Sequence, residues 1–193
     1  MSSDPDYGCS VALDSNVMFF WNVLMEAPAG RRLEEAADGF YPALEAQLEI
    51  TGGRGWAAVG FSSDGLMVGS EAIICVGDQL PRKYNLGGKE SGDVQQMEES
   101  RQTLLDTSSE DMTGGSRMCR FTKSLKEEGE LEIQGMGDSW GTMIFASGDS
   151  SSLGYHGRDT KGTFNIDFAS GAFSEKNIKS VRSNAIKTHG PFT

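Results

Sequence analysis

Short stretches of apolar residues, separated by glycine-rich turns, recur along most of the chain and predict β-strands rather than helices. Residues 43–51 alternate cleanly between apolar and polar side chains, which is typical of a strand with one buried face. Residues 17–24 form a nearly continuous apolar run, which suits a strand buried on both faces. Further strands are predicted over residues 56–61, 68–76, 102–105, 117–121, 141–146 and 163–168.

The connections between these strands also favour an all-β fold. The charged residues 31–37 predict one short helix or a loop, and residues 108–116 predict a loop between two strands. The chain has 193 residues and 25 glycines, enough for one domain with many turns. We therefore predict an all-β, immunoglobulin-like antiparallel β-sandwich of about ten strands. The domain is expected at residues 9–175, with an N-terminal extension at 1–8 and a polar tail at 176–193.

The formal net charge of −11 argues against nucleic-acid binding, because contacts with phosphates need a surplus of lysine and arginine. It also argues against unaided docking on an anionic membrane. An acidic surface either keeps the protein in solution or steers a basic redox partner towards it.

The chain also lacks the sequence signs of membrane insertion or secretion. No apolar run reaches the length of about 18 residues that suggests a membrane span, so direct membrane insertion is not expected. The first residues lack the basic and apolar regions of a signal peptide, so none is expected in this chain.

Three cysteines leave at least one thiol unpaired. No C-x-x-C motif occurs, which argues against a zinc site or a thioredoxin-like redox centre. Cys75 and Cys119 both lie in predicted strands. They either form a disulfide or remain buried free thiols, and the residues alone leave both alternatives open.

Few residues have the arrangement that catalysis requires. The chain has two histidines, His156 and His189, and His189 lies in the polar tail. The motifs of serine hydrolases, zinc proteases, phosphate-binding loops, dinucleotide-binding folds and EF-hands are all missing from the sequence. Carboxylates are numerous, but no spacing selects an acid–base pair. We therefore predict no catalytic residues.

Two segments carry a more specific pattern. Residues 55–74 read GWAAVGFSSDGLMVGSEAII, an apolar strand followed by a turn, a methionine and a second strand. Residues 141–148 read GTMIFASG and lead through a Ser/Gly loop to Tyr155-His156-Gly157 and a final strand. Together the segments resemble the DOMON family, whose haem-binding members include the cytochrome domain of cellobiose dehydrogenase.

Weaker similarities extend this resemblance over about residues 9–170. They include an early cysteine, a strand tryptophan, the segment that follows the methionine-bearing region and an arginine-bearing strand. They correspond to Cys9, Trp21, residues 78–84 and Arg120.

The resemblance implies a cytochrome domain that binds haem b. In the haem-binding members, the methionine after the G-F-S strand and the histidine of the late loop are the axial ligands, which here are Met67 and His156. Tyr84 and Tyr155 are expected to line the haem pocket. Arg120 is expected to pair with a carboxylate inside the fold or with a haem propionate.

A histidine imidazole and a methionine thioether both suit haem iron, and two axial ligands leave no open position for oxygen. The predicted function is therefore electron transfer rather than an enzyme activity. The expected partner is a flavoprotein, a membrane b-type cytochrome, a copper oxygenase or ascorbate. The resemblance further implies an extracellular protein, or one held at a membrane by a fused or partner domain.

Other interpretations remain open at this stage. A lone methionine is usually core packing and a lone loop histidine is usually a surface residue. Trp56 and Phe61 are expected in the sandwich core rather than against haem. The main alternative function is a haem-free DOMON module that binds carbohydrate or another small ligand, with Trp140 as a stacking surface. A third is a structural or interaction domain of a larger extracellular protein.

Overall fold

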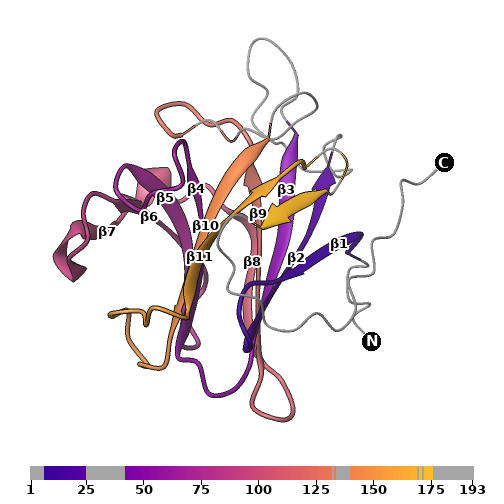
Figure 1. Cartoon of the computed structure of the whole chain (residues 1–193), viewed down its shortest axis with the longest axis vertical. Coiled ribbons are helices and arrows are strands. Elements are labelled where there is room, and N and C mark those ends of the chain that lie inside the picture. The colour runs from indigo at the N-terminus through magenta and orange to yellow at the C-terminus, as the bar shows by residue number, and fades with distance from the viewer. Residues whose placement is uncertain are drawn as a thin grey trace.

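Two antiparallel sheets stacked face to face form the fold in the computed structural model (Figure 1), which describes residues 7–24, 42–131, 133, 140–168, 170 and 172–175. In spatial order, the five-stranded sheet contains β1 (Cys9–Ala12), β2 (Val17–Leu24), β3 (Ala43–Ile50), β9 (Arg117–Ser124) and β8 (Leu105–Asp111). The seven-stranded sheet contains β12 (Phe173–Glu175), β11 (Lys161–Ile166), β10 (Gly141–Gly148), β4 (Trp56–Ser62), β5 (Ser70–Val76), β6 (Arg82–Leu86) and β7 (Val94–Gln96).

The prediction of an all-β antiparallel sandwich is confirmed. Within the described residues, the helices are two short 3-10 turns, η1 (Ser91–Asp93) and η2 (Glu99–Arg101). Among these residues, no helix has the length and apolar character required to cross a bilayer. The stretch 31–37, predicted as a helix or a loop, lies outside the described residues, as do residues 176–193 and most of the extension 1–8.

Two predictions around β8 are wrong. Residues 102–105 were predicted as a strand, but β8 begins at Leu105. The predicted loop 108–116 is strand as far as Asp111, and its turn is closed by a 2.8 Å bond from the Met112 amide to the Ser116 carbonyl. β8 is an edge strand paired with β9 alone, so it needs no apolar alternation and its polar sequence resembles a loop.

Other strands are also missing from the sequence-based prediction. They are β1, β6, β7 and β12. Most are short, and β6 reads RKYNL, which gives little apolar pattern. At β5 the predicted start is two residues too early, because Gly69 adopts a positive φ of 83° that ends the preceding turn.

The core lies between the sheets and follows the alternation seen in the sequence. All four alternating apolar side chains of β3 are buried there, namely Leu44, Ala46, Leu48 and Ile50. β2 buries Val17, Phe19 and Trp21, while the residues between them are half-buried. The prediction that β2 is buried on both faces is therefore wrong, because its second face lies on the outside of the sandwich. β4, in contrast, is buried along its whole length.

A disulfide joins the two sheets through the core. Cys75 on β5 is bonded to Cys119 on β9, and 44 positions separate them in sequence. Of the two alternatives that the sequence left open for Cys75 and Cys119, the disulfide is therefore correct and the buried free thiols are not. Cys9 on β1 keeps a free, half-buried thiol.

A buried ion cluster of Lys83, Lys123, Glu127 and Glu130 makes a second connection between the sheets. Lys83 comes from β6 and Lys123 from β9. Lys83 Nζ lies 2.8 Å from Glu127 Oε2, and Lys123 Nζ lies 2.8 Å from Glu130 Oε2. Burial alone would raise the pKa of Glu127, but the Lys123 ammonium and hydrogen bonds from Lys123, Lys83 and Thr103 lower it overall. The Glu127 carboxylate therefore stays ionised at neutral pH.

Replacing Cys75 and Cys119 together by alanine is expected to lower the free energy of unfolding by about 2–4 kcal/mol, because the unfolded chain regains the entropy of an open loop. Urea denaturation without reductant measures this loss. Cys9→Ala is the matched control and should change stability far less, since its thiol is free. Equal losses in both variants would contradict a stabilising bridge between the sheets.

Lys83→Met should cost about 3–5 kcal/mol, because it leaves buried glutamates without part of their compensating charge. Arg117→Met is the control: it breaks an ion pair with an exposed partner, Asp111, and should cost at most about 1 kcal/mol. Chemical denaturation of both variants compares the two losses. A Lys83→Met protein as stable as Arg117→Met would show that the cluster contributes little.

Candidate functional site

The outer face of the seven-stranded sheet, turned away from the core, is apolar. A single antiparallel sheet usually has polar residues on the face that meets solvent. Here the outward side chains form a second apolar cluster, and Trp56 in it is only 3% exposed. Its buried members are Trp56, Ala58, Ala72, Ile74, Val76 and Leu86. This face therefore has to be covered by other parts of the chain or by a ligand.

Small side chains occupy the middle of this outer face. Ala146, Ala58 and Ile74 are cross-strand neighbours on β10, β4 and β5. The next row contains Ile144, Gly60, Ala72 and Tyr84. A Cβ on Gly60 would lie 2.8 Å from Ile144 Cγ1, so Ile144 packs directly over the glycine. A glycine inside a strand often marks such a close approach. We call Ala58, Gly60, Ala72 and Ala146 the small-residue floor.

The turn between β4 and β5 folds onto this face and carries Met67. The Gly65 amide donates to Ser62 Oγ at 2.9 Å, and the Gly65 carbonyl accepts a 3.2 Å bond from Thr163 Oγ1 on β11. Thr163 alternates with the core residue Phe164 and therefore lies on the outer face. Met67 is half-buried against the apolar cluster. The Ser-x-Asp-Gly sequence of the turn thus directs the methionine over the sheet.

The loop between β10 and β11, residues 149–160, carries His156 and also packs on the sheet. Leu153 contacts the outer apolar cluster. The start of the loop lies tightly on Gly55, where a Cβ would come within 1.9 Å of the Ser150 carbonyl oxygen. The Ser147 amide donates to the Thr160 carbonyl at 2.8 Å and closes the loop.

These two connections leave the sheet from opposite ends. β4 and β10 are antiparallel, with Ser62 beside Thr142 and Trp56 beside Gly148. The β4–β5 turn therefore starts at one end of the strand pair, and the β10–β11 loop starts at the other, at the lower left of Figure 1. Met67 and Leu153 both contact the same outer cluster, so the segments converge on one face.

His156 is half-buried, and its environment favours the neutral imidazole. Burial lowers the pKa of His156, and the nearby Lys161 ammonium lowers it further. Its Nδ1 atom is buried without a hydrogen-bond partner in the described residues. Such a group costs about 1–3 kcal/mol if nothing satisfies it. A neutral imidazole can donate a lone pair from one ring nitrogen to a ligand or metal.

The four predicted site residues form two groups. Met67 and Tyr84 pack against the outer apolar cluster, and the Tyr84 hydroxyl lies 3.4 Å from Gln96 Oε1. Tyr155 stacks on His156, with ring centroids 5.4 Å apart and an angle of 23°. Tyr155 is 83% exposed, so it lies at the surface of the described structure beside His156.

The structure also places three further residues considered in the sequence analysis, namely Arg120, Phe61 and Trp56. Arg120 lies on the outer face of the five-stranded sheet, where its Nε donates to Gln47 Oε1 at 2.8 Å. It is therefore on the opposite side of the sandwich from Met67, which removes the propionate alternative. Phe61 belongs to the core between the sheets, as predicted. Trp56 does not: it lies in the outer cluster, with its Nε1 buried and unpartnered among the described residues.

Sequence reasoning missed the small-residue floor. Its signal was the run Trp56 to Phe61, in which both alternating sets of residues are apolar or small. That run predicted a buried strand, but it does not tell which face meets the other sheet. His189 lies outside the described residues.

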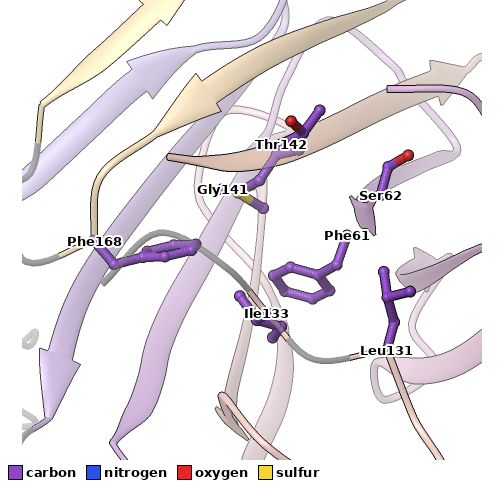
Figure 2. A pocket seen from close by; sticks show the side chains of 8 residues that line it. Phe61, Ser62, Leu131, Ile133, Gly141, Thr142 and Phe168 are labelled. Carbon is purple, nitrogen blue, oxygen red and sulfur yellow. The ribbon is translucent and has the colours of Figure 1, made fainter. Parts of the chain in front are cut away.

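One cavity lies between the sheets and is too small for an organic ligand. It has a volume of about 10 Å³, which is room for roughly one water molecule. Figure 2 shows its lining, with Phe61 and Phe168 on either side of Ile133. Within the described ranges, no group of three or more His, Cys, Asp or Glu side chains converges to hold a bare metal ion. The outer face is therefore the stronger candidate site.

The residues of the outer face fit the group that the sequence resemblance implies, haem b. The floor is made of small apolar residues, Met67 packs against the same cluster, and His156 lies on the loop whose Leu153 contacts it. Trp56 Nε1 in the cluster and His156 Nδ1 on the loop are buried without a partner in the described chain. The search of protein-family models matches no family, and no curated protein is similar in sequence. The candidate site is therefore the basis for the proposed function.

Gly55→Ala should destabilise the fold by about 1–3 kcal/mol and displace the β10–β11 loop, because the new methyl group would overlap the Ser150 backbone. Amide NMR shifts of residues 149–156 and urea denaturation report the two effects. Gly154→Ala in the same loop is the control, since its nearest neighbour would be 3.7 Å away. Unchanged shifts in Gly55→Ala would show that the loop does not depend on this contact.

Proposed function

We propose that this chain binds haem b on the outer face of the seven-stranded sheet and passes single electrons, with Met67 and His156 as the axial ligands. The main support is the apolar outer face itself, with its small-residue floor and the two candidate ligand segments folded onto it. Haem, when bound, supplies a one-electron iron couple. A thioether and an imidazole are suitable axial ligands for that iron.

The chain supplies the surroundings of the proposed site. The alanines of the floor add little side-chain bulk to the sheet beside Ile144, which packs over Gly60, and Trp56 and Ile74 make the surroundings apolar. Lys161 stands beside Ala146 at one side of the floor, and Arg82 stands beside Ile74 at the other. Lys161 matches one carboxylate of haem b in charge, whereas Arg82 is already bonded to Glu99 at 3.0 Å.

The exposed apolar residues also favour a binding role for the two segments that carry Met67 and His156. Six large hydrophobic side chains of the described chain are exposed, and three of them directly flank the proposed ligands in sequence. Leu66 and Val68 flank Met67 and are 63% and 46% exposed, and Tyr155 precedes His156. Exposed apolar residues beside candidate ligands are consistent with a binding surface on each of the two segments.

The proposed activity needs a redox partner and no substrate turnover by the chain itself. The candidate partners are a flavoprotein, a membrane b-type cytochrome, a copper oxygenase or ascorbate. The net charge of −11 favours a basic docking surface on a protein partner. The disulfide between Cys75 and Cys119 supports a location in an oxidising compartment, such as the extracellular space.

A haem-free module that binds carbohydrate has less support. Trp140, 50% exposed, precedes β10, and Tyr155 follows it, so these two exposed rings flank the strand instead of standing side by side along it. No group of exposed aromatic rings that would form a stacking platform stands out among the described residues.

The absorption spectrum of the protein reconstituted with haem tests the proposal. The wild type should give a low-spin spectrum with a sharp Soret band, and dithionite should produce distinct α and β bands. Met67→Ala and His156→Ala should each convert it towards a high-spin spectrum and shift the midpoint potential. Met112→Ala, at the hairpin tip of the other sheet, and His189→Ala are matched controls and should leave both unchanged.

Two results would count against the proposal. If the wild type takes up no haem from a stoichiometric titration, the function is wrong. If haem binds but both ligand variants keep the wild-type spectrum, the two axial ligands are wrong.

A further inference from the structure

We infer that Tyr155 is a positioning residue for His156: its exposed ring stacks on the imidazole, fixes the orientation of the imidazole and shields it from water. This role presupposes the proposed haem site and adds to it a residue that does not touch the haem.

The geometry of the pair supports this role. The ring centroids lie 5.4 Å apart and the planes are inclined by 23°, which is a stacked arrangement. Consecutive side chains of a strand point to opposite sides, but residues 154–157 have irregular backbone that turns both rings to the same side. Tyr155 is 83% exposed whereas His156 is half-buried, and the stacked tyrosine ring covers one face of the imidazole.

Among the described residues, no hydrogen bond anchors the His156 side chain to a distant part of the chain. Burial lowers the pKa of the imidazole, and local interactions with the backbone of Gly157 and of His156 itself act in the opposite direction and raise it. A metal-bound histidine usually donates from its second ring nitrogen to a carboxylate or a carbonyl, which fixes the orientation of the ring. Nδ1 of His156 has no partner within the residues described here. Packing therefore adds to these local backbone interactions in orienting the imidazole, and the stacked tyrosine is the aromatic contact that provides it.

Tyr155 itself is held by the same contact. Its hydroxyl has no hydrogen-bond partner in the part of the chain that the structure describes, and little of its surface is covered. A tyrosine serving the fold would be expected to bury its ring or to bond its hydroxyl. The ring is thus the functional part of the side chain, and the hydroxyl is dispensable.

Tyr155→Leu and Tyr155→Phe separate the ring from the hydroxyl. An aromatic pair of this kind contributes enough free energy that Tyr155→Leu should bind hemin about three- to tenfold more weakly, measured by Soret titration. The ferric spectrum of Tyr155→Leu should also gain a high-spin component, because the imidazole loses its fixed orientation. Tyr155→Phe keeps the stack and should restore both the affinity and the low-spin spectrum.

Trp140→Leu is the control, since Trp140 is also an exposed aromatic residue but is not stacked on His156. It should bind hemin with wild-type affinity. In the haem-free wild type, NMR cross-peaks between the two rings should be present and should be lost in Tyr155→Leu.

The outcomes distinguish this inference from the proposed function. If the wild type binds haem with low-spin ligation and Tyr155→Leu matches it in affinity and spectrum, the positioning role is wrong and the haem site stands. If Tyr155→Phe behaves like Tyr155→Leu, the hydroxyl rather than the stack matters, and the inference is overturned. If the wild type binds no haem at all, the proposed function and this role fall together.

Discussion

β4 has apolar side chains on both sides of the seven-stranded sheet, and burial of apolar surface requires that both sides be covered. One side meets the five-stranded sheet and forms the core. On the other side, the described residues form no third layer of secondary structure, and the β4–β5 turn and the β10–β11 loop pack there. This constraint decides where the candidate ligands lie, because Met67 and His156 belong to these two segments.

The connections between the sheets make a stable support for that outer face. The disulfide links β5 to β9 through the core, and the buried ion cluster links β6 to β9 and the segment after it. β5 and β6 also carry Ala72, Ile74 and Tyr84 on the outer side. The inward side chains of β5 and β6 therefore link the two sheets, and the outward side chains of the same strands form part of the candidate site. Sites built on rigid strands hold their geometry better than sites built on loops alone.

The two candidate ligands differ in how the chain holds them. Met67 follows a tight turn that is bonded to Thr163, and it is half-buried against the outer cluster. His156 lies in a longer loop, and its imidazole has a ring stack but no hydrogen bond at Nδ1 within the described chain. Burial and Lys161 keep this imidazole neutral, which is the state that can donate a lone pair to a metal. The weaker anchoring of the histidine explains why a neighbouring aromatic ring matters to it.

The sequence by itself determined that the fold is a sandwich and where most strands lie. It also determined which side chains of β3 face the core, because all of these follow from local alternation of apolar and polar residues. It did not determine β8, whose edge position frees it from that alternation, or the pairing of Cys75 with Cys119, which depends on which strands face each other. It also could not tell that Trp56 points outwards while Phe61 points into the core, because both belong to one continuously apolar run. Only the tertiary structure decided which face of β4 meets the second sheet, since that choice depends on the packing of strands far apart in the chain.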